Sequence, residues 1–136
     1  MNFFIIAIFC SIAALAFAQN TFPSGAQLSA GESKFSPSRS FQLILQGDGN
    51  LVIYNAVTGA YKWATQTIGS GATKAIMQTD GEFTLQTASG EIVWRTYTRD
   101  AGSWLELQED GKITVFSPKG YAAWNSATGY GTKTTV

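Results

Sequence analysis

The chain has 136 residues and a net charge of zero, with 9 Lys and Arg against 9 Asp and Glu. This length holds one domain, and the charge balance lacks the basic surface by which proteins bind nucleic acid. The sequence has no His, the commonest general base and metal ligand, and its 1 Cys cannot form an intrachain disulfide. Charged residues make up 13%, aromatic residues 13%, and Gly occurs 14 times. This composition predicts a small all-β domain of short strands joined by tight turns.

The N-terminus is an apolar run from Phe3 to Ala18 with few interruptions. It ends in Ala16-Phe17-Ala18, a small-x-small pattern that suits signal peptidase. The alternative is an uncleaved anchor, but spanning a bilayer takes about 20 apolar residues, and this run is shorter. We expect residues 1–18 to be a signal peptide and residues 19–136 to be the domain. The localisation is then secreted and extracellular, with no membrane insertion after cleavage.

The segment after this run predicts an opening strand and turn at Gln27 to Glu32 and at Lys34-Phe35. Beyond it the chain repeats itself. Three copies of the pattern apolar-Gln-x-Asp-Gly-x begin at Leu45, Met77 and Leu107, spaced by roughly 30 residues. Each copy is followed by an alternating run and then, at a matched offset, by Trp63, Trp94 or Trp124.

Each copy predicts strand, turn, strand, loop and strand. In the first copy the strands are predicted by the alternation over residues 41–46, by the run Leu51 to Tyr54 and by the run Tyr61 to Thr67. The turn is predicted by Asp48-Gly49. Units of this size cannot fold alone and must share a core. We therefore expect three antiparallel sheets around a common centre, with one Trp from each unit pointing into it.

Two features lie outside the repeat. Trp104 has no counterpart in the other copies, and the sequence leaves open whether it belongs to the core or makes an exposed contact. The tail from Thr132 to Val136 is rich in Thr and strand-like, so it could complete a neighbouring sheet or pair with another chain.

The first copy carries five residues two positions apart: Gln46, Asp48, Asn50, Val52 and Tyr54. They fill the pattern Gln-x-Asp-x-Asn-x-Val-x-Tyr, in which the chain resembles the bulb-type (monocot-type) mannose-binding lectin family. The resemblance extends from about residue 21 to residue 136. It implies an all-β fold, a β-prism of three four-stranded antiparallel sheets with a pseudo-threefold internal repeat. It also implies a site for α-mannosides, independent of metal and cofactor, in each sheet that keeps its motif.

The spacing of these five residues also suits a sugar. Alternate positions lie on one face of a strand, so the five side chains face outward while Leu43, Leu45, Leu51 and Ile53 face the core. A carboxylate accepts hydrogen bonds, and an amide both donates and accepts. By the resemblance, Asp48 and Asn50 hold the axial 2-hydroxyl of mannose, Gln46 the 3-hydroxyl and Tyr54 the 4-hydroxyl, while Val52 contacts ring carbons. The alternative is that Val52 and Tyr54 are covered by a loop or a partner chain.

The other two copies keep only Gln78 and Asp80, and Gln108 and Asp110, so we treat these four residues as possible degenerate sites. In the second copy we expect Glu82 to repel Asp80 and to remove an amide donor. In the third copy we expect Lys112 to pair with Asp110, and Phe116 lacks the phenolic hydroxyl. Both copies are interpreted as structural remnants, the alternative being that either binds a different sugar.

These observations predict a carbohydrate-binding protein for mannose-containing glycans or glycoproteins, with one intact site and no catalysis. The acidic residues are dispersed over separate sheets, and no Ser has a His partner, so an enzyme is disfavoured. A single site of this kind binds with Kd on the order of a millimolar, so avid binding needs a homo-oligomer such as a dimer. The alternative function is a lectin-like scaffold that binds protein, as an inhibitor, defence or matrix component, without binding sugar.

Overall fold

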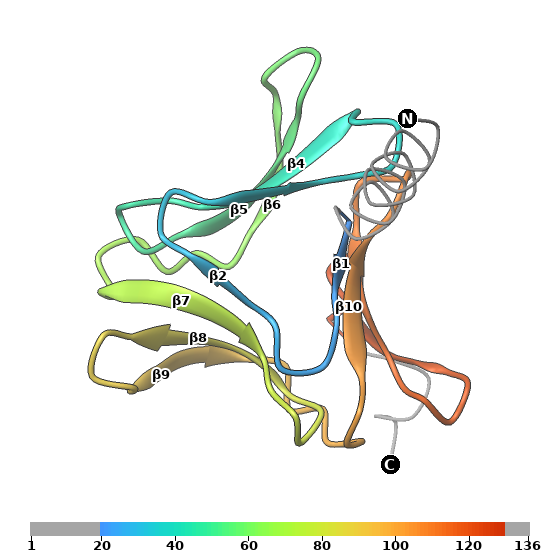
Figure 1. Cartoon of the computed structure of the whole chain (residues 1–136). Coiled ribbons are helices and arrows are strands. Elements are labelled where there is room, and N and C mark those ends of the chain that lie inside the picture. The colour runs from blue at the N-terminus through green and yellow to red at the C-terminus, as the bar shows by residue number, and fades with distance from the viewer. Residues whose placement is uncertain (1–19, 130–136) are drawn as a thin grey trace, which may run out of the picture.

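The computed structural model describes residues 20–129, and the regular structure in this range consists of β-strands (Figure 1). The strands are β1 (Thr21–Phe22), β2 (Gln27–Ser29), β3 (Ser33–Phe35), β4 (Phe41–Leu45), β5 (Leu51–Asn55), β6 (Tyr61–Ala64), β7 (Ala72–Met77), β8 (Phe83–Thr87), β9 (Ile92–Arg95), β10 (Trp104–Leu107), β11 (Ile113–Phe116) and β12 (Ala122–Asn125). Within this range no helix has the length and hydropathy needed to cross a bilayer. The expected signal peptide and the Thr-rich tail lie outside the described residues.

The strands form three sheets that make the sides of a triangle in Figure 1. The first sheet has the order β3-β4-β5-β6, the second β2-β7-β8-β9 and the third β1-β10-β11-β12, with antiparallel neighbours throughout. The predicted architecture of three four-stranded antiparallel sheets is therefore confirmed. Each copy of the repeat supplies three strands of one sheet.

The fourth strand of every sheet comes from the N-terminal segment. Its strands β1, β2 and β3 join the third, second and first sheets in turn, so one short stretch of chain links all three. The sequence predicted an opening strand and turn here but not β1, which is two residues long and pairs with β10. Pairing between residues so far apart in the chain leaves no local sequence pattern.

The core lies between the three sheets. In the first sheet Leu43, Leu45, Leu51 and Ile53 are completely buried, as their alternation predicts. At the centre Trp63, Trp94 and Trp124 pack edge to face, with ring centroids 6.0, 6.0 and 5.5 Å apart. Edge-to-face aromatic pairs contribute about 0.5–1.5 kcal/mol each beyond their burial, so this triangle stabilises the contact between all three copies. The prediction that these Trp side chains meet in the core is confirmed.

The Asp-Gly turns lie at the corners where neighbouring sheets meet. At Gly81, which has φ 98°, a Cβ atom would lie less than 3.0 Å from the backbone of Asp100, where the chain enters the third sheet. At Gly111, with φ 83°, it would lie 2.5 Å from Lys62 Cε and 2.6 Å from Phe41 Cε1 of the first sheet. Glycine is thus required at these turns both by backbone conformation and by the approach of the neighbouring sheet.

A buried carboxylate reinforces the corner between the second and third sheets. The Asp100 side chain is 8% exposed and accepts hydrogen bonds from the Tyr121 hydroxyl, from Ser117 Oγ at 2.7 Å and from Lys119 Nζ at 3.4 Å. These donors, the Tyr121 hydroxyl foremost, lower the pKa of Asp100 to about 2. The linker before β10 is thereby tied to the turn between β11 and β12.

Candidate carbohydrate-binding site

The five candidate residues of the first copy lie together on the outer face of the first sheet. Gln46 follows β4, Asp48 is in the turn, Asn50 precedes β5, and Val52 and Tyr54 lie on β5. On that face Val52 is paired with Ile44, and Tyr54 with Gln42. The intervening residues Leu51 and Ile53 point into the core, so the strand period sends the candidate side chains outward.

Three of the polar side chains form a connected row. With the Gln46 amide oriented so that both of its ends find partners, the Tyr54 hydroxyl donates to Gln46 Oε1 at 2.6 Å. In the same orientation Gln46 Nε2 donates to the Asp48 carboxylate oxygens at 3.2 and 3.3 Å. Asp48 itself is exposed, and its carboxylate can accept further hydrogen bonds from a ligand.

The orientation of the Asn50 amide is fixed by the neighbouring β6 end of the sheet. Its oxygen accepts from Thr65 Oγ1 at 3.2 Å and from the Thr67 backbone N–H at 3.1 Å. The backbone N–H of Asn50 donates to Asp48 Oδ1 at 3.0 Å. Because Oδ1 is occupied, Nδ2 is the part of the amide left to donate to a ligand, in a residue that is 6% exposed. The contact of its backbone N–H places Asn50 next to the Asp48 carboxylate.

Val52 differs from the expectation. It lies on the outer face, but only 2% of it is exposed, so it cannot present a broad apolar surface to a sugar. Its cross-strand partners Ile44 and Ala64 lie on either side of it in the sheet. Val52 thus forms the floor of the site, while the half-buried ring of Tyr54 supplies exposed apolar surface.

One feature beside this site was missed by the sequence analysis. A hollow of about 400 Å³ lies between Gly47 and Asp48 on one side and residues 68–73 on the other. Ile68 lines it and is 67% exposed, which is unusual for a large apolar side chain. The sequence signal that could have revealed this hollow was an isolated Ile in the loop between two predicted strands. The hollow extends the candidate site toward Ile68.

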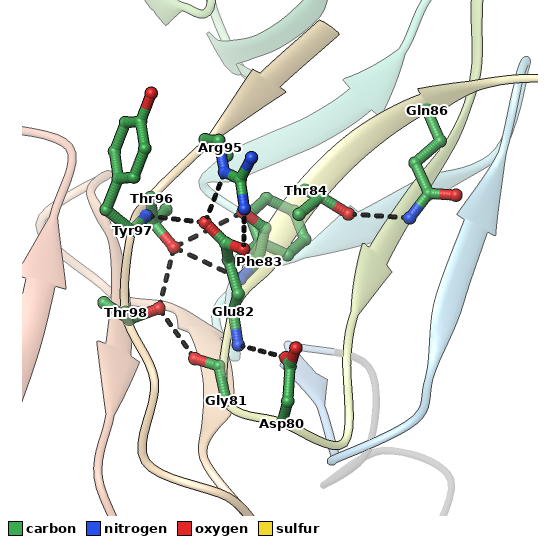
Figure 2. A network of polar contacts seen from close by, with 10 residues as sticks. All are labelled: Asp80, Gly81, Glu82, Phe83, Thr84, Gln86, Arg95, Thr96, Tyr97 and Thr98. Atoms are coloured by element: carbon green, nitrogen blue, oxygen red, sulfur yellow. Dashed lines mark hydrogen bonds and ion pairs between the residues drawn. The ribbon is translucent and has the colours of Figure 1, made fainter. Parts of the chain in front are cut away.

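The second copy is organised around an ion pair (Figure 2). Arg95 donates from Nε to Glu82 Oε2 and from Nη2 to Glu82 Oε1, both at 2.8 Å, and the Tyr97 backbone N–H donates to the same carboxylate at 2.9 Å. The hydrogen bond to Glu82 raises the pKa of Arg95. The expectation that Glu82 repels Asp80 is wrong, because Asp80 accepts the Glu82 backbone N–H at 3.1 Å while the Glu82 carboxylate faces a cation.

Arg95 also changes the floor of this copy. It pairs across the strands with Thr84, as Ala64 pairs with Val52 in the first sheet, so a long charged side chain replaces a methyl group. Gln86 turns toward Thr84 and donates to its hydroxyl at 3.0 Å. Gln78 keeps its place, but its buried Oε1 has no hydrogen-bond partner. The row of linked side chains seen in the first copy is therefore absent from the described residues of this one.

The third copy has other side-chain contacts in place of the row seen in the first copy. Lys112 pairs with Asp110 at 3.5 Å, as predicted. Phe116 stacks on Trp104 with ring centroids 5.8 Å apart, and Trp104 Nε1 donates to Glu106 at 2.7 Å. Trp104 therefore lies on the outer face of the third sheet. Gln108 is also occupied, since its Oε1 accepts from the Thr114 hydroxyl at 2.6 Å.

Across residues 20–129 no three His, Cys, Asp or Glu side chains are grouped so that they could hold a metal ion. The side chains gathered in the first copy are amides, a carboxylate and a phenol, which suit a neutral ligand with several hydroxyl groups.

Comparison with known proteins identifies the family. No family model matches the chain. The chain is 32% identical over 110 residues to the B-type lectin plumieribetin of Scorpaena plumieri, and the match covers 79% of this chain and 94% of that protein. It is 31% identical over 102 residues to a mannose-specific lectin of Aloe arborescens, covering 72% of this chain and 89% of that protein. The chain belongs to the bulb-type mannose-binding lectin family.

A solved structure of this family shares the fold. The mannose-specific agglutinin of snowdrop, Galanthus nivalis, solved with methyl-α-D-mannoside, superimposes with a TM-score of 0.64 at 33% identity. The match covers 72% of this chain and 89% of the snowdrop chain. The β-prism expected for a bulb-type lectin is therefore confirmed.

Proposed function

We propose that this bulb-type lectin binds α-mannose-type glycans, without a metal ion, at Gln46, Asp48, Asn50, Val52 and Tyr54. The observation that carries the proposal is the fixed Asn50 amide, whose oxygen is held by Thr65 and Thr67, in a residue whose backbone N–H donates to the Asp48 carboxylate. The relative from Aloe arborescens is named mannose-specific, and the snowdrop agglutinin was solved with a mannoside, which supports the same ligand class here.

The site recognises mannose by matching one hydroxyl with both a donor and an acceptor. The axial 2-hydroxyl, which distinguishes mannose from glucose, donates to Asp48 and accepts from Asn50 Nδ2. Gln46 binds the 3-hydroxyl and Tyr54 the 4-hydroxyl, and their mutual contact holds both in place before the sugar arrives. Val52 keeps the floor beneath the ring apolar. Because these side chains are already positioned by the fold, little entropy is lost on binding.

We infer a single mannose-binding site in each chain, because the second and third copies have Glu82 and Lys112 in place of the amide donor of Asn50. They also lack a phenol at the position of Tyr54, and in the second copy Glu82 is paired with Arg95. Each sugar hydrogen bond replaces one to water and nets about 0.5–1.5 kcal/mol, so one site gives a Kd on the order of a millimolar. Strong binding then requires several sites on a multivalent glycan, which a dimer of this chain provides. With a cleaved signal peptide, the ligands are extracellular glycans, a setting that suits defence.

Replacing Asp48 by Ala tests the site, and Asp80→Ala in the second copy is the matched control. Both carboxylates accept the backbone N–H two residues on, at 3.0 and 3.1 Å, so both variants lose the same turn contact. Capture of the protein on immobilised mannan should fall at least about tenfold for Asp48→Ala, which loses a charge-assisted hydrogen bond to the sugar. Asp80→Ala should bind as the wild type does. Unchanged capture by Asp48→Ala, or equal loss in both variants, contradicts the proposal.

A further inference from the structure

The corner between the third and first sheets holds a hollow of about 440 Å³ that differs in charge from its counterpart beside Asp48. Its lining includes Lys62, Trp63, Asp110, Lys112 and Ser126. Two ammonium groups and one carboxylate give it a net positive charge in a chain whose total charge is zero. The hollow beside Asp48 has a carboxylate as its one charged group among the residues that line it. The two corners therefore suit ligands of different charge.

The position of Lys62 is held by packing. A Cβ atom at residue 111 would lie 2.5 Å from Lys62 Cε, so the absence of a side chain at Gly111 lets the Lys62 stem cross the turn. The ammonium group of Lys62 lies 5.6 Å from the centroid of the Phe41 ring, within the range of a cation–π contact. The Lys62 side chain is thus held by the Phe41 ring of its own sheet and by the Gly111 turn of the third sheet.

Lys112 supplies the second cation, at the position that Asn50 occupies in the first copy. Its ion pair with Asp110 has an N–O distance of 3.5 Å, and the two side chains are 37% and 57% exposed. Exposed pairs of this kind contribute little, because water screens both charges. A ligand anion can therefore take the place of Asp110 as the partner of Lys112.

The remaining lining offers the contacts that a sugar ring needs. Ser126 Oγ accepts from the Ile113 backbone N–H at 3.0 Å, which leaves its hydroxyl hydrogen to donate to a ligand. The half-buried Trp63 adds an apolar wall for ring C–H groups. We propose that this corner binds an acidic sugar residue, with its carboxylate or sulfate between Lys62 and Lys112 and its ring against Trp63.

This site is separate from the neutral-hexose site, so it can be tested separately. The ¹⁵N-labelled protein is titrated with glucuronate, with glucose 6-sulfate and with uncharged glucose. The acidic sugars should shift the backbone amides of Gly111 and Ser126 and the indole N–H of Trp63, and added salt should weaken the effect. If only one acid acts, that result identifies the anionic group. No shift with either acid, or equal shifts with glucose, overturns the proposal.

Charge variants make the test specific. Lys62→Gln and Lys112→Gln should each weaken binding of the acidic sugar about tenfold, whereas Lys74→Gln, a change at an exposed Lys of β7, should not. Asp110→Asn should tighten binding, since it removes the competing carboxylate while its Oδ1 can still accept the Lys112 backbone N–H, a contact of 3.2 Å in the wild type. Equal effects of Lys74→Gln and Lys62→Gln, or weaker binding by Asp110→Asn, contradict the assignment. Asp48→Ala should bind the acidic sugar with the affinity of the wild type. This result does not depend on whether the mannose proposal holds.

Discussion

Gly81→Ala should destabilise the protein more than any other Gly→Ala change at a turn of the second sheet. At φ 98° an L-residue loses about 1–2 kcal/mol to backbone strain. The new Cβ also overlaps the backbone of Asp100, which cannot rotate away as a side chain could. Such overpacking adds typically about 1–3 kcal/mol. We therefore expect the free energy of unfolding to fall by about 2–5 kcal/mol, a large share of the stability of a domain of this size.

Gly90→Ala is the matched control for this change. Gly90 has φ 92° in the same sheet, but a Cβ there would meet no atom within 4 Å. It should lose only the strain of about 1–2 kcal/mol. Urea denaturation of both variants measures the difference, and thermal denaturation should show the larger fall in Tm for Gly81→Ala. Equal losses in the two variants would refute the conclusion that the sheets meet in close backbone contact at this corner.

Three further changes test the site and its surroundings. Asn50→Asp keeps the oxygen that Thr65 and Thr67 need but removes the Nδ2 donor, so calorimetry should show mannoside affinity falling about tenfold. Asn55→Asp, at the last residue of β5, should have no effect. Asp100 has a folded pKa of about 2 against an ordinary value of 3.8, so its ionised form stabilises the fold above pH 4 and this contribution disappears as the pH falls toward 2. The urea midpoint of Asp100→Asn should change less with pH than that of the wild type between pH 4 and pH 2. The same pH dependence in both proteins would contradict the assignment. Arg95→Ala leaves the Glu82 carboxylate buried without its cation and should lower Tm, and adding Glu82→Gln should recover part of the loss; no recovery would mean that the pair is not coupled.

The repeat made most of the fold predictable. Alternation over residues 41–46 and the matched positions of the three Trp residues located strands and core, because both depend on the side-chain period of a strand. The strand ends and β1 were less predictable. The third strand of the first copy was expected from Tyr61 to Thr67 but ends at Ala64, since Thr65 and Thr67 turn their hydrogen bonds toward Asn50 and the Asp-Gly turn.

The candidate site was predicted as a set of residues but not in its contacts. Spacing placed Val52 on the outer face, yet its burial depends on side chains of two neighbouring strands, which spacing does not reveal. The pairing of Glu82 with Arg95 was missed for the same reason, because Glu82 precedes β8 and only the register of β8 with β9 brings Arg95 close to it. The contact of Lys112 with Asp110 was predicted because it is local in sequence.

Titration of the ¹⁵N-labelled protein with methyl-α-mannoside tests most directly whether the first copy is the mannose site. The side-chain amide signals of Gln46 and Asn50 and the backbone amides of residues 46–54 should move together, with a Kd on the order of a millimolar. The corresponding signals of residues 78–86 and 108–116 should stay in place. The proposal is contradicted if Asn50 does not respond at tens of millimolar sugar, or if all three copies respond alike.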